Sequence, residues 1–258
     1  MTDFNSKRSG FGTKEWAEHN FNIGTGCRHS CRYCYARHNA LKHGIIKDAS
    51  EWKDEKVTID FAKKKFSRHN GIVMFPTQHD ITPTNINACI DALTRMLEIG
   101  DRVLIVSKPN LDCTKLLCEK LIDFQEQIMF RFTIGSNKED VCRFWEPGAP
   151  SPEERIKSLK LAFDMGYETS VSAEPMLEGY NGALALYDAV IGYITNDIWF
   201  GKMNFPRQRV DVSVAENLRA VERVEIFQSN DEIRCLYEHF KDNPKVAWKE
   251  SVKKVVGI

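Results

Sequence analysis

Three cysteines that lie within eight residues of one another carry the clearest chemical signal in the chain. Cys27, Cys31 and Cys34 follow a C-x₃-C-x₂-C spacing. Thiolates are soft ligands that suit iron–sulfur chemistry, and three of them can hold three irons of a cubane. A ferredoxin-type cluster needs a fourth cysteine, and no other cysteine lies near this segment. The spacing therefore predicts a [4Fe–4S] cluster in which one iron stays open to a substrate.

A zinc site is the alternative interpretation of the same segment, because His38 lies four residues after Cys34. Three cysteines and one histidine are an established ligand set for structural zinc. Small zinc modules rarely occupy the first strand of an α/β enzyme of this size, so iron–sulfur chemistry is favoured. The other cysteines show no ligand-like pairing and are expected to be small buried residues without a second cluster. They are Cys89, Cys113, Cys118, Cys142 and Cys235.

The composition is that of an ordinary folded domain of 258 residues with balanced charge. Hydrophobic residues make up 42% of the chain, and 36 basic residues stand against 36 acidic ones. The zero net charge gives no global field that would indicate nucleic acid or a membrane. Residues 1–70 nevertheless hold 14 Lys or Arg against 8 Asp or Glu. This excess, to which Lys63–Lys65 contribute, predicts a solvated face, with phosphate binding as the alternative.

No segment is long and apolar enough to predict a membrane span. The best candidate, Ala183–Ile194, is shorter than the roughly 18 apolar residues that a span requires, and it carries Asp188. Residues 1–10 are polar and lack the apolar centre of a signal peptide. We therefore expect a cytoplasmic protein, in which a tight group of cysteines indicates metal binding rather than disulfides.

Short apolar runs alternate with amphipathic segments from residue 21 to residue 203. Alternation at roughly 30-residue spacing is typical of βαβ units and a parallel sheet. It predicts an α/β fold, a partial (β/α)₆ TIM-type barrel with C-terminal helices and an active site at the carboxyl ends of the strands. A doubly wound sheet gives much the same pattern and stays open. The predicted strands are Phe21–Gly24, Gly71–Phe75, Arg102–Val106, Ile128–Ile134, Glu168–Ala173 and Asp197–Met203. The predicted helices between them are Cys31–Lys47, Asn85–Ile99, Thr114–Gln127, Pro152–Met165 and Asn181–Ile191.

Local signals mark several helix ends and the end of the regular alternation. Ser151–Glu154 reads Ser-Pro-Glu-Glu, the pattern of a capping box with proline at the first helical position. Gly100 and Gly166 stand where two helices should end. We expect an N-terminal segment of residues 1–20, a barrel of residues 21–206 and a closing segment of residues 207–258. The closing segment is predicted to hold a connection and two helices, namely Arg207–Val214, Asp231–Lys241 and Pro244–Val256.

The cysteine segment resembles the motif of the radical S-adenosylmethionine (SAM) superfamily. That motif has the same spacing with an aromatic residue before the third cysteine, a place that Tyr33 fills. Within the superfamily the chain looks most like the spore photoproduct lyase-like branch and its small uncharacterised relatives. This likeness rests on the opening Gly26-Cys27, the closing residues 33–37, Ser107–Pro109 after the third strand and Ser172–Pro175 after the fifth.

The resemblance implies a radical enzyme in a partial barrel. In the family the open iron binds the amino and carboxylate groups of SAM, and the reduced cluster passes one electron to the sulfonium. The resulting 5′-deoxyadenosyl radical takes a hydrogen atom from the substrate. An external electron donor of flavodoxin or ferredoxin type is implied as a partner.

One departure from the family affects the cofactor site. Many members hold the amino group of SAM with Gly-Gly-Glu after the second strand, whereas this chain has Pro-Thr-Gln-His-Asp at 76–80. Thr77, Gln78 and Asp80 are the candidates for that role. The other predicted cofactor-binding residues are polar groups at strand ends and the motif aromatic: Tyr33, Lys108, Thr133, Ser136, Glu174 and Asn204.

Two catalytic candidates and a substrate hypothesis complete the predictions. Glu174 ends the fifth strand, and Cys142 is placed to return a hydrogen atom to a substrate radical, with an incidental buried cysteine as the alternative. Arg143 and Trp145 suggest a clamp for phosphate and base, with packing at the barrel rim as the alternative. The predicted substrate is nucleic acid or else a small metabolite or peptide. A zinc-stabilised binding protein is the non-enzymatic alternative.

Overall fold

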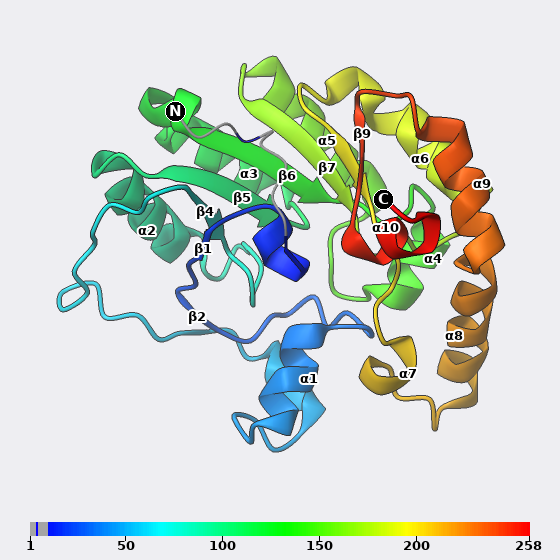
Figure 1. Cartoon of the computed structure of the whole chain (residues 1–258). Coiled ribbons are helices and arrows are strands. Elements are labelled where there is room, and N and C mark those ends of the chain that lie inside the picture. The colour runs from blue at the N-terminus through cyan, green and yellow to red at the C-terminus, as the bar shows by residue number, and fades with distance from the viewer. Residues whose placement is uncertain (1–3, 5–9) are drawn as a thin grey trace.

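The computed structural model describes Phe4 and residues 10–258, and within them a seven-stranded parallel sheet forms the centre of the molecule (Figure 1). Its strands follow the order β1-β4-β5-β6-β7-β8-β9. This order never reverses, as it would in a doubly wound sheet, so the fold is a partial barrel with β1 and β9 at its open edges. The strands are β1 His19–Asn20, β4 Ile72–Phe75, β5 Arg102–Ser107, β6 Ile128–Thr133, β7 Glu168–Ala173, β8 Ile198–Phe200 and β9 Val246–Trp248.

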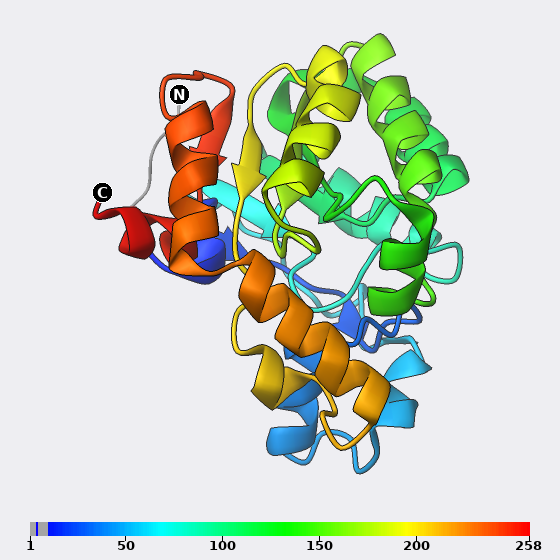
Figure 2. The same cartoon turned by 90° about the vertical axis from the view of Figure 1, so that its right-hand side faces the viewer.

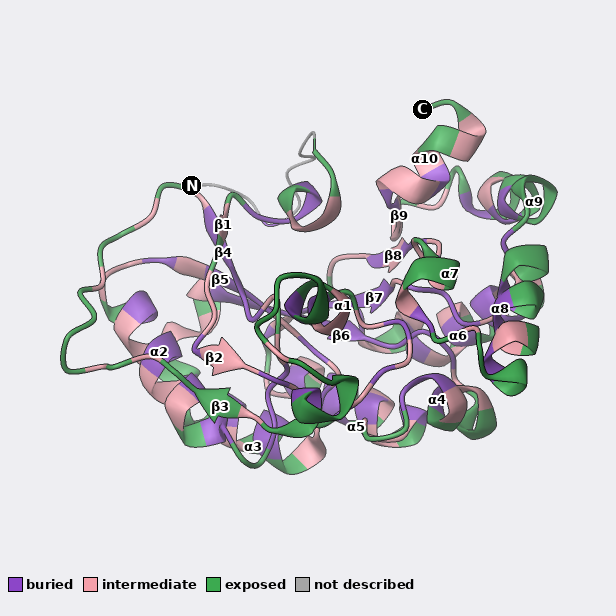
Figure 3. Ribbon diagram, turned by 90° about the horizontal axis from the view of Figure 1, so that it is seen from below, coloured by how far each residue is buried: buried purple, intermediate pink, exposed green. Residues whose placement is uncertain are grey.

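Helices cover the outer face of this sheet (Figures 1 and 2). They pack on β4 to β8, whose side chains are almost all buried, and burial is concentrated in the strands and the inner helix faces (Figure 3). The α-helices are α1 Tyr35–Lys42, α2 Ile86–Glu98, α3 Leu111–Lys120, α4 Glu139–Trp145, α5 Pro152–Asp164, α6 Tyr180–Val190, α7 Pro206–Arg209, α8 Ala215–Phe227, α9 Asn230–Phe240 and α10 Glu250–Val256. The 3₁₀-helices are η1 Gly12–Glu15, η2 Ala49–Lys53, η3 Ile122–Gln127 and η4 Ile191–Tyr193.

The predicted signals at helix ends are found, with one change. Gly100 and Gly166 have φ of +88° and +83°, values that favour glycine. The Ser151 hydroxyl accepts a hydrogen bond from the amide of Glu154 at 3.1 Å. The Glu154 carboxylate does not return to complete a capping box. It accepts hydrogen bonds from the amide of Leu111 at 3.0 Å and from the side-chain amide of Asn110 at 2.8 Å. Glu154 therefore joins α5 to the start of α3.

The predicted first strand, Phe21–Gly24, is wrong in position. The sheet pairing lies earlier, at His19–Asn20, which runs parallel to Val73–Met74. The chain then leaves the sheet, and Gly24–Thr25 (β2) pairs antiparallel with Lys56–Val57 (β3). The apolar run was informative about burial, since Ile23 is buried, but not about the strand that buries it.

The predicted helix Pro244–Val256 is wrong in its first half. Val246–Trp248 forms β9, parallel to β8, and only Glu250–Val256 is helical. The reason is packing, because the Trp248 ring lies 5.9 Å from that of Phe200 and completes the core at the open edge. Helices α4 and α8 were not predicted, and the predicted connection Arg207–Val214 includes most of α7. Across the described part of the chain, no helix combines the length and apolar character needed to cross a bilayer.

Candidate functional site

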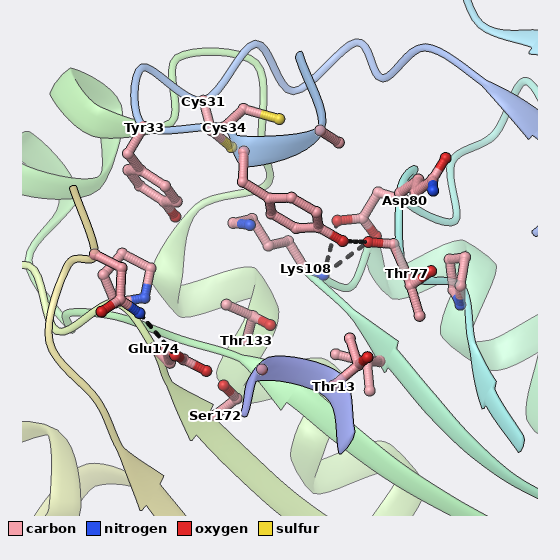
Figure 4. A pocket seen from close by; sticks show the side chains of 18 of the residues that line it. Thr13, Cys31, Tyr33, Cys34, Thr77, Asp80, Lys108, Thr133, Ser172 and Glu174 are labelled. Carbon is pink, nitrogen blue, oxygen red and sulfur yellow. Dashed lines mark hydrogen bonds between the residues drawn. The ribbon is translucent and has the colours of Figure 1, made fainter. Parts of the chain in front are cut away.

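A cavity of about 500 Å³ opens at the carboxyl ends of the strands (Figure 4). This is the face where the sequence analysis places an active site, and the volume lies in the range of small-molecule sites. In Figure 4, Cys31 and Cys34 lie across the cavity from Thr133, Ser172 and Glu174. The cavity brings together most of the predicted site residues: Cys27, Cys31, Cys34, Tyr33, Thr77, Gln78, Asp80, Lys108, Thr133, Glu174 and Asn204.

The cysteine loop is held by backbone hydrogen bonds and one tight glycine. The amide of Cys27 donates to the carbonyl of Trp52 at 2.7 Å. Gly26 has φ of +90°, and a Cβ atom there would lie 2.2 Å from the carbonyl oxygen of Asp54. At the other end of the loop, the Cys34 thiol caps α1 by accepting from the amide of Arg37 at 3.4 Å. The loop conformation is therefore set by its own sequence and by the neighbouring η2–β3 segment.

Residues 144–148, the end of α4 and the turn that follows it, support the cysteine loop. The amide of Arg32 donates to the carbonyl of Trp145 at 2.8 Å, and the Arg32 Nε donates to the carbonyl of Phe144 at 2.7 Å. The amide of Gly148 donates to the carbonyl of His29 at 2.9 Å. Residues that lie more than 100 positions later in the chain thus hold Arg32, which directly follows Cys31. They also hold His29, which lies between Cys27 and Cys31.

Gly148→Ala tests this support. A Cβ atom at Gly148 would lie 2.3 Å from the carbonyl oxygen of Arg28, a backbone atom that cannot move without the loop. We expect the variant to lose about 1–3 kcal/mol of unfolding free energy and to bind iron less well than wild type. Urea denaturation and iron analysis of the two proteins measure both effects. Gly192→Ala is the matched control, because a Cβ there meets nothing within 4 Å. Equal losses in the two variants would contradict the proposed support.

The three thiols fit an iron–sulfur cluster as a donor set. Burial raises the pKa of Cys27 well above the ordinary value, and Asp80 and Cys31 raise it further. Burial likewise raises the pKa of Cys31 to about 12. Buried thiolates that repel one another are stabilised when iron binds, since the metal supplies the missing positive charge.

The alternative zinc site is not formed. In residue 4 and residues 10–258, no three His, Cys, Asp or Glu side chains gather closely enough to hold a single metal ion. His38 lies on α1 and does not complete such a group with the cysteines. A four-iron cubane is a larger body than one ion and connects sulfurs that lie farther apart.

A buried carboxylate, Glu146, connects the cysteine loop to the barrel. Its side chain has no exposed surface, and it pairs with Arg155 at 2.5 Å and with Lys108 at 3.8 Å. The Tyr33 hydroxyl donates to the same carboxylate. Burial alone would raise the pKa of Glu146, but the two cations lower it below the ordinary value. The network fixes Tyr33 and Lys108 on one wall of the cavity.

Asp80 also lines the cavity, and it is held by the cysteine loop and by the end of β5. Its Oδ2 lies 3.2 Å from Nδ1 of His29, a loop residue that the sequence analysis missed. Asp80 also accepts hydrogen bonds from the hydroxyl of Ser107 and the amide of Lys108. Burial opposes the charge, yet His29 and Lys108 lower the pKa of Asp80 to about 2. Its oxygens are therefore already occupied by the protein.

The other two candidates after β4 differ from Asp80. The Thr77 hydroxyl accepts a hydrogen bond from Asn22 at 2.8 Å. Gln78 is exposed, and within the described residues its side chain has no hydrogen-bond partner. Of the three, Gln78 is the side chain whose polar atoms remain available to a ligand.

A second missed group closes the opposite end of the cavity. Lys249 is 1% exposed, and its Nζ lies 2.6 Å from Glu15 and 3.2 Å from Glu174. Burial raises the pKa of Glu174, and Lys249 opposes that shift. Lys249 directly follows β9, so it was missed together with that strand, and Glu15 pairs with it across 234 residues of sequence.

Four residues singled out in the sequence analysis lie away from the cavity. Ser136 is buried and donates to Glu178 at 2.5 Å, so it turns outward from the ribose position expected for it. Cys142 is 2% exposed, does not line the cavity and donates to the carbonyl of Ser136 at 3.4 Å. Trp145 is 3% exposed and packs against Phe144 and Tyr33, so its ring cannot stack on a base. Arg143 is exposed and pairs with Glu139 at 2.7 Å.

Comparison with known proteins identifies the fold. No model of a protein family matches the chain. An uncharacterised protein, ORF301 of Acidianus two-tailed virus, is 26% identical over 172 residues. The match covers 62% of this chain and 56% of the viral protein, so the chain spans little more than half of that relative.

Two solved structures share the arrangement of strands. A variant of spore photoproduct lyase with bound S-adenosylmethionine and dinucleoside spore photoproduct matches 93% of this chain and 78% of its own, with 16% identity and a TM-score of 0.60. Streptococcus suis SuiB bound to its precursor peptide SuiA matches 72% of this chain and 39% of its own, with 12% identity and a TM-score of 0.50. Both neighbours are radical SAM enzymes. The chain therefore shares the partial-barrel fold of these two enzymes, with its three-cysteine loop at the mouth of the barrel.

Proposed function

We propose that this protein is a radical SAM enzyme that binds a [4Fe–4S] cluster through Cys27, Cys31 and Cys34 and cleaves SAM reductively. One observation carries the proposal, namely that all three cysteines line one cavity at the carboxyl ends of the barrel strands. The fold match to a protein with bound S-adenosylmethionine supports it. When bound, the cluster would supply the electron that breaks a carbon–sulfur bond of the sulfonium.

The residues of the cavity suit the two ends of SAM. Lys108 is a partly buried cation over the ring of Tyr33 in the cysteine loop, and we assign it to the carboxylate of the methionine part. Gln78 is available to accept a hydrogen bond from the amino group. Thr133 and Ser172, at the ends of β6 and β7, offer hydroxyl groups to the ribose. The apolar lining, which includes Met74 and Val106, would exclude water from a radical.

The substrate and the electron donor belong to the same proposal. We take a nucleic-acid substrate as the first candidate and a small metabolite or peptide as the second. An external donor of flavodoxin or ferredoxin type is required, because the one-electron step consumes a reductant. All eight cysteines are free, which fits the reducing cytoplasm in which such a donor works.

Product analysis tests the proposal. Anaerobically prepared, cluster-loaded protein is treated with dithionite and SAM, and the products are measured by mass spectrometry. We expect methionine and 5′-deoxyadenosine in equal amounts, formed slowly even without substrate, and neither compound without dithionite. A reduced, cluster-loaded sample that forms neither product would show that the proposed function is wrong.

A further inference from the structure

Two cations in the cavity wall have no carboxylate within ion-pair distance in the described residues. Lys202 and Arg209 both line the cavity and are half-buried. In the part of the chain that the structure describes, neither side chain has an ion pair or a hydrogen bond. The other two lysines of the cavity differ, because Lys108 pairs with Glu146 and Lys249 with Glu15. A half-buried cation without an ion pair has lost part of its hydration without the full compensation that a carboxylate or phosphate would give.

Lys202 and Arg209 lie on different elements of the fold from Lys108. Lys202 follows β8 and Arg209 ends α7, whereas Lys108 follows β5. With Lys108 assigned to the carboxylate of SAM, Lys202 and Arg209 remain for a second anion. Burial lowers the pKa of both side chains; for Lys202 burial is the one cause, whereas for Arg209 the acidic groups Cys34 and Glu174 oppose the shift without cancelling it.

Two exposed aromatic rings flank Arg209. Its guanidinium carbon lies 5.9 Å from the ring centre of Tyr35 and 5.5 Å from that of Phe205. Tyr35 is 38% exposed and Phe205 is 55% exposed. The Tyr35 hydroxyl donates to the carbonyl of Thr77, which fixes the ring at the edge of the cavity.

The backbone at Phe205 is in a conformation that bulky residues rarely adopt. Its φ is +54° and its ψ is +50°, the left-handed region, where a residue with a large side chain is an outlier. Here the strain is not offset by burial, since more than half of the ring is exposed. An exposed ring held by a strained backbone against Arg209, which lines the cavity, indicates a role in binding.

We propose that Lys202, Arg209, Tyr35 and Phe205 form a subsite for a single-stranded nucleic acid, with a phosphate on the cations and bases on the rings. The proposal rests on the proposed function, because the subsite would present a nucleotide to the cavity in which SAM is cleaved. A groove that combines cations with exposed rings is the usual means of binding single strands. A peptide carboxylate would need the cations alone. This subsite replaces the predicted clamp of Arg143 and Trp145.

Salt-dependent binding tests the subsite. The cluster-loaded protein with SAM is titrated against a fluorescent DNA or RNA strand of about ten nucleotides at several salt concentrations. Each phosphate contact on a single strand contributes a log–log slope of roughly −0.7. The double variant Lys202→Met/Arg209→Leu removes both cations from the one phosphate and should therefore lose about 0.7 of the wild-type slope.

A second variant examines stacking apart from charge. Phe205→Gly should weaken binding roughly 5- to 150-fold with the slope unchanged. Because glycine accepts positive φ freely, the melting temperature of this variant should not fall. An unchanged affinity in a folded Phe205→Gly protein would overturn the stacking assignment.

The neighbouring Arg207 provides the matched control. It lies on the same helix, but it pairs with Glu225 at 2.6 Å and does not line the cavity. Arg207→Ala should change neither the slope nor the affinity, and an equal effect of the two arginines would overturn the subsite. So would competition by an acidic peptide of equal charge as effective as that by the strand. Wild type that forms 5′-deoxyadenosine but binds no strand would refute the subsite alone. Slope loss specific to Lys202 and Arg209 without SAM cleavage would support the subsite and refute the radical function.

Discussion

Replacing Cys27, Cys31 and Cys34 by alanine is expected to reduce bound iron to background and to abolish formation of 5′-deoxyadenosine. The three thiols are the cysteine donors that line the cavity. The absorbance near ~400 nm that arises from sulfur-to-iron charge transfer should disappear with the iron. Iron analysis, the visible spectrum and product analysis measure the loss independently.

Two other cysteines serve as controls for this experiment. Cys235 is exposed on α9, and Cys89 is fully buried in α2, remote in sequence from the loop. Cys235→Ala and Cys89→Ala should both keep the full iron content. Iron retained by the triple variant would contradict the assignment, and so would iron lost from either control.

Glu146→Gln is expected to lower the free energy of unfolding by about 3–5 kcal/mol. The substitution keeps the shape of the side chain but removes the charge that compensates Arg155, whose side chain has no exposed surface. An isolated buried cation is costly, which is why breaking such a pair is far more damaging than breaking one at the surface. Urea denaturation of the two proteins in the same buffer gives the difference.

Two further variants show whether the loss of stability comes from the unpaired buried Arg155 or merely from removing a negative charge. Glu139 pairs with Arg143 in an exposed position, so Glu139→Gln should cost at most about 1 kcal/mol. Glu146→Leu combined with Arg155→Met removes both charges and should recover much of the loss. A Glu146→Gln variant as stable as Glu139→Gln would show that the buried network contributes little.

The cysteine loop and most strand ends could be predicted because their signals are local. The C-x₃-C-x₂-C spacing is contained in eight residues, and Lys108, Thr133 and Glu174 each directly follow or end an apolar run. The parallel arrangement then brings all of these residues to one face. No pairing between distant segments had to be known.

The missed residues depend on contacts between distant segments. Lys249 follows a three-residue strand that is recognisable only from its pairing with β8. His29 gains its role from Asp80, which lies 51 residues later. For Cys142 and Trp145 a usable signal was present, because their spacing of three residues is that of a buried helix face.

The pairing of Lys249 with Glu15 also bears on how the chain reaches its native state. The Lys249 Nζ donates to the carbonyl of Gly12 at 2.8 Å, and the amide of Glu250 donates to Glu15 at 2.7 Å. The wall of the cavity that Lys249 and Gly12 share therefore forms only after a loop of more than 200 residues has closed. Such contacts form slowly and, during synthesis, only once residue 250 has left the ribosome. A nascent chain thus exposes its cysteine loop long before the Lys249 side of the cavity exists, so a cluster of the kind proposed above would be enclosed only after this contact has formed.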